Sequence, residues 1–122
     1  MKYIAFTFDD GRSDNYLLAK RIMDKYQFSG TVYITTGFID GTWEDKDVLQ
    51  SPTRPLTVEE INGLHSSGWE IGLHGDKHKT QKDDMRIALD KLQSWGITND
   101  YWGISVPNSS ASETCLLYTS DA

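Results

Sequence analysis

The chain has 122 residues, 38% of them hydrophobic, which suits one small domain and not two. Its 18 acidic side chains outnumber the 12 basic ones, giving a net charge of −6, and no basic block is present, so we expect no nucleic-acid partner. No apolar stretch is long enough to span a bilayer and no signal peptide is visible, so the sequence as written predicts a cytoplasmic protein without a membrane span.

The first predicted element is a buried strand over residues Lys2 to Phe8, which include β-branched and aromatic side chains. We expect this strand to end at Asp9, because two successive carboxylates, Asp9 and Asp10, cannot both face a core without partners. Since Asp-Gly is a common turn pair, a plain turn at Asp10 and Gly11 is the alternative interpretation.

A helix capped by Ser13 or Asp14 is predicted next, followed by a short β-branched strand over Gly30 to Thr35. The order strand, helix, strand favours a parallel pair with a crossover connection. The apolar positions that recur at helical spacing, and that we expect to lie in the core, are Tyr16, Ala19, Ile22, Met23 and Tyr26.

Residues Thr36 to Pro55 form a polar stretch with two glycines and two prolines, which predicts a loop longer than a connection needs. Trp43 in this loop has two interpretations. It either pins the loop to the body of the protein or offers an aromatic face on which a sugar stacks.

Thr57 and Glu60 form a capping box, which predicts a helix from Thr57 to the stop at residues 66–68. His65 lies in the last turn of that helix, and we expect it to interact with the carboxyl end of the helix and not with a metal.

The sequence after residue 68 predicts a strand, a helix and a further strand. The strand covers Trp69 to Leu73, the helix carries an apolar stripe that ends at Gly96, and the last strand covers Tyr101 to Val106. The resulting order, βαβαβαβ, is that of a parallel-stranded α/β protein, either an open sheet or part of a barrel. The stripe of the helix consists of Met85, Ala88, Leu89, Leu92 and Trp95.

Two of the predicted strands end in residues that could bind a metal. Asp9 and Asp10 follow the first, and His74 and His78 follow the third. Ligands of parallel α/β folds bind at the carboxyl ends of the strands, and one carboxylate with two imidazoles leaves coordination positions open, as in a catalytic metal site. With a second carboxylate as base, such a site suits metal-assisted hydrolysis. The alternative is a pair of surface histidines, since H-x-x-x-H alone is a weak signal.

The segments Thr7–Gly11 and Glu70–His78 resemble the first two motifs of the polysaccharide deacetylases, the NodB-homology group that forms carbohydrate esterase family 4. The resemblance covers roughly Lys2 to Ser109, including the helix start at Pro55–Ile61. It implies the N-terminal portion of a distorted (β/α) barrel. It also implies hydrolysis of N-acetyl groups on amino-sugar polymers of the peptidoglycan or chitin type.

The resemblance also implies roles for single residues. Asp9 would be the general base, and Asp10, His74 and His78 would hold one divalent metal, usually zinc. An N-acetylated polysaccharide or oligosaccharide would be the partner.

This sequence departs from the family pattern at three points. Ser105 stands where the family has an arginine that orients the base, and Gly75 stands where it often has Ser or Thr, which predicts a looser metal loop. No histidine follows His78, so the family's catalytic acid is missing. A sugar-binding protein with impaired catalysis, or a metal-dependent amidase with another substrate, therefore remains as an alternative function.

The predicted extent of the domain is residues 1–114, a partial NodB-like domain. The family barrel needs about seven or eight strands and four are predicted here, so we expect a truncated and weakly active form of a longer protein. Residues 115–122, which contain the single cysteine, Cys115, resemble a translated sequencing adapter and are predicted to be a non-native tail. The alternative is a genuine short tail.

Overall fold

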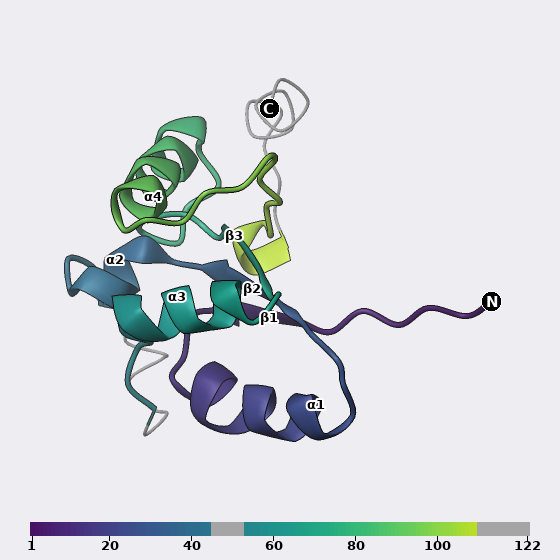
Figure 1. Cartoon of the computed structure of the whole chain (residues 1–122). Helices are drawn as coiled ribbons and strands as arrows, with labels where there is room; N and C mark the ends of the chain where they lie inside the picture. Colours follow the sequence, from purple (N-terminus) through teal and green to yellow (C-terminus); the bar gives the residue numbers. More distant parts are fainter. Residues whose placement is uncertain (45–52, 110–122) are drawn as a thin grey trace.

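A computed structural model describes residues 1–44 and 53–109 of the chain. It is an α/β structure with parallel strands, as predicted (Figure 1). The predicted non-native tail, 115–122, lies outside the described residues. In chain order the elements are β1 (Thr7–Asp10), η1 (Asn15–Lys20), α1 (Arg21–Lys25), β2 (Thr31–Ile34), α2 (Thr36–Asp40), α3 (Val58–Ser66), β3 (Glu70–Leu73), α4 (Lys82–Ser94) and η3 (Pro107–Ser109).

The three strands form one parallel sheet in the order β1-β2-β3. The register aligns Asp10 with Ile34, and Ile34 with Leu73. All three strands therefore end at the same edge of the sheet. The residues that follow them, including His74, are brought to that edge.

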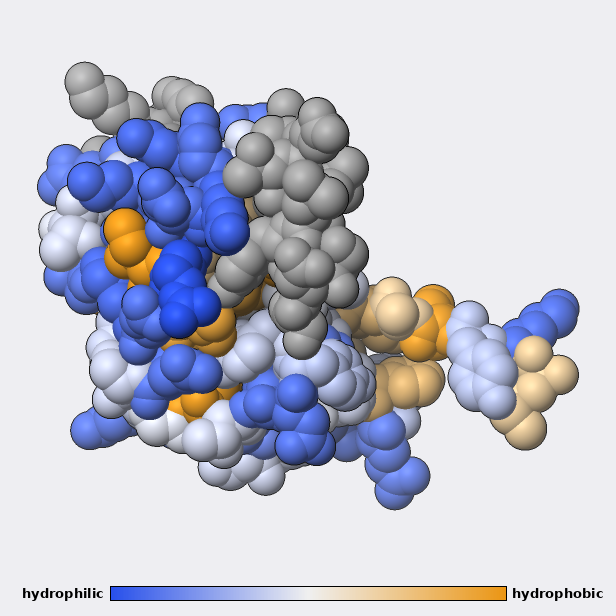
Figure 2. Space-filling model, turned by 90° about the horizontal axis from the view of Figure 1, so that it is seen from above, coloured by the Kyte–Doolittle hydropathy of each residue, from blue (hydrophilic) through white to orange (hydrophobic). Residues whose placement is uncertain are grey.

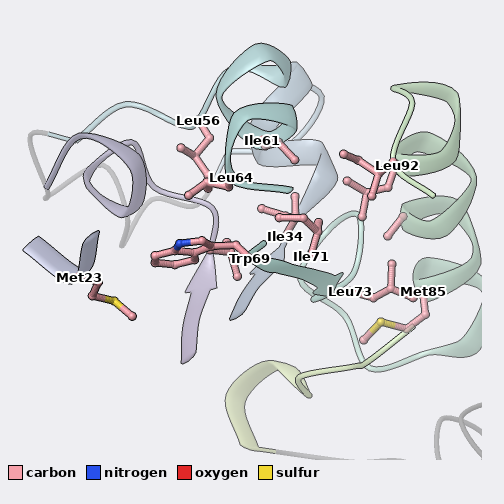
Figure 3. Packing of buried hydrophobic residues seen from close by; sticks show 13 residues of the cluster. Met23, Ile34, Leu56, Ile61, Leu64, Trp69, Ile71, Leu73, Met85 and Leu92 are labelled. Carbon is pink, nitrogen blue, oxygen red and sulfur yellow. The ribbon is translucent and has the colours of Figure 1, made fainter. Parts of the chain in front are cut away.

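One face of the sheet is covered by helices. Side chains alternate along a strand, so Val32 and Ile34 of β2 point to the same face as Ile71 and Leu73 of β3. Figure 3 shows this layer packed against hydrophobic side chains of the helices. The helices and their flanking residues supply Met23, Leu56, Ile61, Leu64, Met85, Ala88 and Leu92 to the core.

The first strand differs from its prediction at both ends. It begins at Thr7 and includes both Asp9 and Asp10. Pairing with β2 reaches back only to the carbonyl of Phe6, which accepts the N–H of Thr31 at 3.0 Å. The residues before it have no neighbouring strand among the described residues, so they project from the body (Figures 1 and 2), with Tyr3 88% exposed.

The helix after β1 is present, but its apolar stripe is only partly in the core. Its first part, η1, is a π-helix, and each i→i+5 turn rotates the following positions relative to an α-helix. Met23 is consequently buried, whereas Ile22 and Tyr26 are exposed, contrary to the prediction.

Two further expectations are corrected. The long predicted loop begins with a short helix, α2, which ends where Gly41 adopts a φ of 78°. The predicted strand over Tyr101 to Val106 is reduced to one parallel bridge between Ile104 and Leu73, because no described strand pairs with its other side.

The predicted helices α3 and α4 are confirmed. At the start of α3, Glu60 donates its N–H to the hydroxyl of Thr57 at 3.1 Å, and Thr57 donates its N–H to the carboxylate of Glu60 at 3.0 Å. No helix in the described parts of the chain is long and apolar enough to cross a membrane.

The Thr57→Ala variant should unfold more easily than the parent, because it leaves the N–H of Glu60 without its hydroxyl acceptor. We expect the free energy of unfolding to fall by about 1 kcal/mol in chemical denaturation. Thr57→Ser keeps the hydroxyl and should match the parent. If the alanine and serine variants were equally stable, the capping box would not support α3.

Candidate metal centre

Asp10, His74 and His78 lie together beyond the carboxyl ends of β1 and β3. The Oδ1 of Asp10 is 3.4 Å from the Nε2 of His74 and 3.5 Å from the Nε2 of His78. One ligand atom from each residue lies within 4.8 Å of the other two. The arrangement follows from the parallel register, since Asp10 ends β1 and His74 directly follows β3. The three side chains can therefore approach one ion.

The ring of His74 is held in one orientation. Its Nδ1 lies 2.7 Å from the carbonyl oxygen of Ser105, so Nδ1 carries the hydrogen and donates it. In the neutral ring Nε2 is then the free acceptor, and this is the atom that faces Asp10. A hydrogen bond on the far nitrogen of the ring is the usual way in which proteins orient a metal-binding histidine. Ser105, where an arginine was expected, contributes its backbone and not its side chain.

The charges in the cluster support one another. Hydrogen bonds to His74 and then His78 outweigh desolvation and hold the pKa of Asp10 well below its usual range. Burial lowers the pKa of His74, but the hydrogen bonds to Asp10 and to the Ser105 carbonyl, with the charges of Asp9 and Asp10, raise it overall. Asp10 is thus an anion at neutral pH, as a metal ligand must be.

Two of the three residues have unusual backbone conformations. Asp10 has a φ of 79° and His78 a φ of 55°, both in the left-handed region that residues other than glycine seldom adopt. Such residues concentrate at functional sites, where the surrounding structure compensates for the strain.

The loop that carries His78 is anchored by Asp84, a buried residue in the first turn of α4. Its carboxylate accepts the backbone N–H of Asp76 at 3.0 Å, of Lys77 at 3.1 Å and of Lys79 at 3.0 Å. Gly75 has a φ of 85°, and a Cβ at this position would lie 2.5 Å from the carboxylate of Asp84. Gly75 was expected to loosen the loop. Its lack of a side chain instead makes room for the Asp84 carboxylate, which holds the loop in place.

A second network joins this loop to α2 and α4. The buried carboxylate of Asp76 accepts the hydroxyl hydrogen of Thr36 at 2.7 Å and lies 2.7 Å from the Nζ of Lys91. Lys91 also reaches Asp40, at the end of α2, at 2.6 Å. The network fixes α2 beside the loop, and it was not predicted from the sequence.

The other residues considered from the sequence lie outside the three-residue cluster. Asp9 is exposed and aligned with Tyr33, and its charge contributes to raising the pKa of His74. His65 is paired through its Nε2 with the Oδ1 of Asn99 at 3.1 Å, and not with the end of its own helix. Trp43 stacks on His78, which connects the predicted loop to the site.

Besides the network around Asp76, sequence reasoning missed the Asp84 anchor, the Ser105 carbonyl and the stack of Trp43 on His78. An acidic residue such as Asp84 in the first turn of a helix is common as a partner of the helix dipole, so its sequence position carried no distinct signal. A backbone carbonyl has no sequence signal.

The comparisons with known proteins identify the family. The family model described as polysaccharide deacetylase matches residues 1–121. The chain belongs to the polysaccharide deacetylase family. The comparison with curated proteins found no match to this chain.

Solved structures support the fold of this polysaccharide deacetylase chain. The Streptococcus pyogenes deacetylase PplD in complex with acetate is 23% identical, with a TM-score of 0.80 over 98% of this chain and 52% of its own. IcaB from Ammonifex degensii is 18% identical, with a TM-score of 0.78 over 98% of this chain and 56% of its own. A family 4 acetyl xylan esterase from Clostridium thermocellum in complex with a cobalt ion is 24% identical, with a TM-score of 0.61 over 95% of this chain and 54% of its own. The chain thus spans about half the length of each.

The Asp84→Asn variant should lose stability, because an uncharged amide accepts weaker hydrogen bonds from the three N–H groups that now reach the Oδ2 of Asp84, and its NH2 group faces the N–H of Lys77 in place of Oδ1. A hydrogen bond to a charged group contributes about 1.5 to 3 kcal/mol, and we expect the free energy of unfolding to fall by an amount of that order in a denaturation curve. Amide hydrogen exchange at residues 76, 77 and 79 should also accelerate.

Asp83→Asn is the matched control, since Asp83 is an exposed carboxylate in the same turn. It removes a carboxylate that interacts favourably with the helix dipole, a contribution of less than about 1 kcal/mol. Equal losses for the two variants would show that Asp84 acts through its charge alone and not as the anchor of the loop.

Proposed function

We propose that Asp10, His74 and His78 hold one divalent metal, most favourably zinc, and that the chain removes N-acetyl groups from amino-sugar polysaccharides. The observation that carries this proposal is the convergence of a carboxylate and two Nε2 atoms, with the second nitrogen of His74 already committed to Ser105. Membership of the polysaccharide deacetylase family supports the substrate class.

The residues fit a divalent ion by their chemistry. Zinc accepts imidazole nitrogen and carboxylate oxygen, and three protein ligands leave a position open for a substrate. Asp10 supplies the negative charge, and His74 presents an unprotonated Nε2 once its raised pKa is exceeded. A bound ion would supply Lewis-acid polarisation of an amide carbonyl and acidify a nearby water. The solved acetyl xylan esterase with its cobalt ion supports the binding of a metal ion in this fold.

Asp9 is proposed as the general base. It directly precedes Asp10 in β1, it is exposed and it lies outside the cluster of three, so its carboxylate is available to accept a proton. A base must lie near the reacting water without being consumed as a ligand. Hydrolysis of an N-acetyl group breaks the bond between the carbonyl carbon and nitrogen, and it yields acetate and an amine. The structure of PplD with acetate supports that choice of product.

Asn substitutions separate the two proposed roles. Asparagine tolerates the left-handed backbone of Asp10, so Asp10→Asn changes the charge without adding strain. We expect this variant to lose at least about tenfold in Zn²⁺ affinity, measured by calorimetry. Asp9→Asn should bind Zn²⁺ like the parent, yet lower acetate release from N-acetylchitooligosaccharide by about 10² to 10⁴.

Removing the metal from the parent with a chelator, then adding Zn²⁺ back, provides the control for the acetate assay. Activity that survives chelation would contradict a metal-dependent hydrolase. Equal Zn²⁺ affinities of the two Asn variants would contradict the division of roles. Zn²⁺ and oligosaccharide binding without acetate release would favour the sugar-binding alternative.

A further inference from the structure

The ring of His78 is enclosed by two other rings. On one side the indole of Trp43 lies nearly parallel to it, with 5.6 Å between ring centroids and 13° between ring planes. On another side the ring of His74 approaches edge to face, with 4.7 Å between centroids and 76° between planes. His78 therefore presents its Nε2 to Asp10 from between a stacked indole and a perpendicular imidazole.

The two histidines of the cluster are supported differently. The Nδ1 of His74 donates to the Ser105 carbonyl, which fixes that ring. Within residues 1–44 and 53–109, no hydrogen bond reaches the Nδ1 of His78. Its backbone is in the left-handed region as well. Besides the Asp10 carboxylate and the edge of the His74 ring, the group that contacts this imidazole is the indole of Trp43, which stacks on its face.

Trp43 is itself held firmly against the loop of His78. The N–H of Trp43 donates to the carbonyl of Gly37 at 3.0 Å, and the N–H of Gly37 donates to the carbonyl of Asp76 at 2.8 Å. Gly37 leaves no room for a side chain, because a Cβ there would collide with the carbonyl oxygen of Asp76 and with the Cβ of Trp43. The bridge from Lys91 to Asp40 fixes the far end of α2. The indole thus sits on a rigid support.

We infer that Trp43 is a positioning residue for His78. Its indole fixes the plane of the imidazole, and so the direction of Nε2, in place of the hydrogen bond that orients His74. The inference rests on the proposed metal site. It adds Trp43, which affects metal binding only through the proposed ligand His78. An imidazole that carries positive charge, by binding a metal, also gains from facing an indole.

The test compares Zn²⁺ affinity, measured by calorimetry, in the parent, Trp43→Leu and Trp43→Phe. Leucine keeps apolar bulk without a planar face, so it should weaken Zn²⁺ binding by about tenfold, the usual effect of removing a partner that orients a ligand. Phenylalanine keeps a face that can stack and should recover most of that loss. Phe38→Leu is the matched control, because it also replaces an aromatic ring by leucine, at a partly buried residue of the neighbouring helix α2 that contacts no other ring among the described residues, and it should bind Zn²⁺ like the parent.

A second measurement needs no substitution. In the NMR spectrum of the parent, the ring current of the indole should shift the ring protons of His78 upfield of those of His65, which pairs with Asn99. The shift should persist in Phe38→Leu. It remains decisive even if Trp43→Leu fails to fold.

The outcomes separate this inference from the proposed function. A parent that binds no Zn²⁺ would overturn both. A parent that binds Zn²⁺, with Trp43→Leu binding equally tightly, would overturn the positioning role and leave the metal site intact. A phenylalanine variant as weak as the leucine variant, or His78 protons without the upfield shift, would also overturn it.

Discussion

The parallel register of the three strands determines where the chemistry of this chain lies. Asp10 is aligned with Ile34 and Leu73, and the ladder continues as His74 donates its N–H to the carbonyl of Ile34 at 3.0 Å. A shift by one residue would turn Asp10 to the opposite face of the sheet. Ile34 and Leu73 resist such a shift because each is buried in the core, and full burial of such a side chain is worth about 1.5 to 3 kcal/mol. The site therefore depends on the hydrophobic core beside it.

The sequence predicted those elements whose signals are local. The capping box of Thr57 and the apolar stripe from Met85 located α3 and α4, a β-branched run located β2, and a short strand-like run from Trp69 located β3. Elements that depend on distant partners were predicted less well. Residues before Thr7 have strand-forming side chains but no adjacent strand among the described residues, and α2 is stabilised by bonds to the loop after β3. Secondary structure of this kind is decided by tertiary contacts that no local pattern contains.

The same distinction applies to the site. Asp10, His74 and His78 could be grouped from the sequence because each follows a predicted strand, and the topology of parallel strands brings such positions together. Their supports could not be found in this way. Asp84 binds three N–H groups of a loop five to eight residues earlier, and the carbonyl of Ser105 lies 31 residues after the histidine that it orients. These contacts depend on the path of the backbone, which residue types alone do not specify.

The strained residues show why those supports matter. A left-handed backbone at a residue other than glycine costs about 1 to 3 kcal/mol, and Asp10 and His78 both adopt it. A hydrogen bond to a charged group contributes about 1.5 to 3 kcal/mol, and Asp84 accepts three in the loop that leads to His78. The free energy of the hydrogen bonds to Asp84 is thus of the same order as the backbone strain of Asp10 and His78. Asp84 itself lies outside the cluster. Because folding already fixes the positions of the donor atoms, a ligand that binds there loses little of its binding energy to ordering the protein.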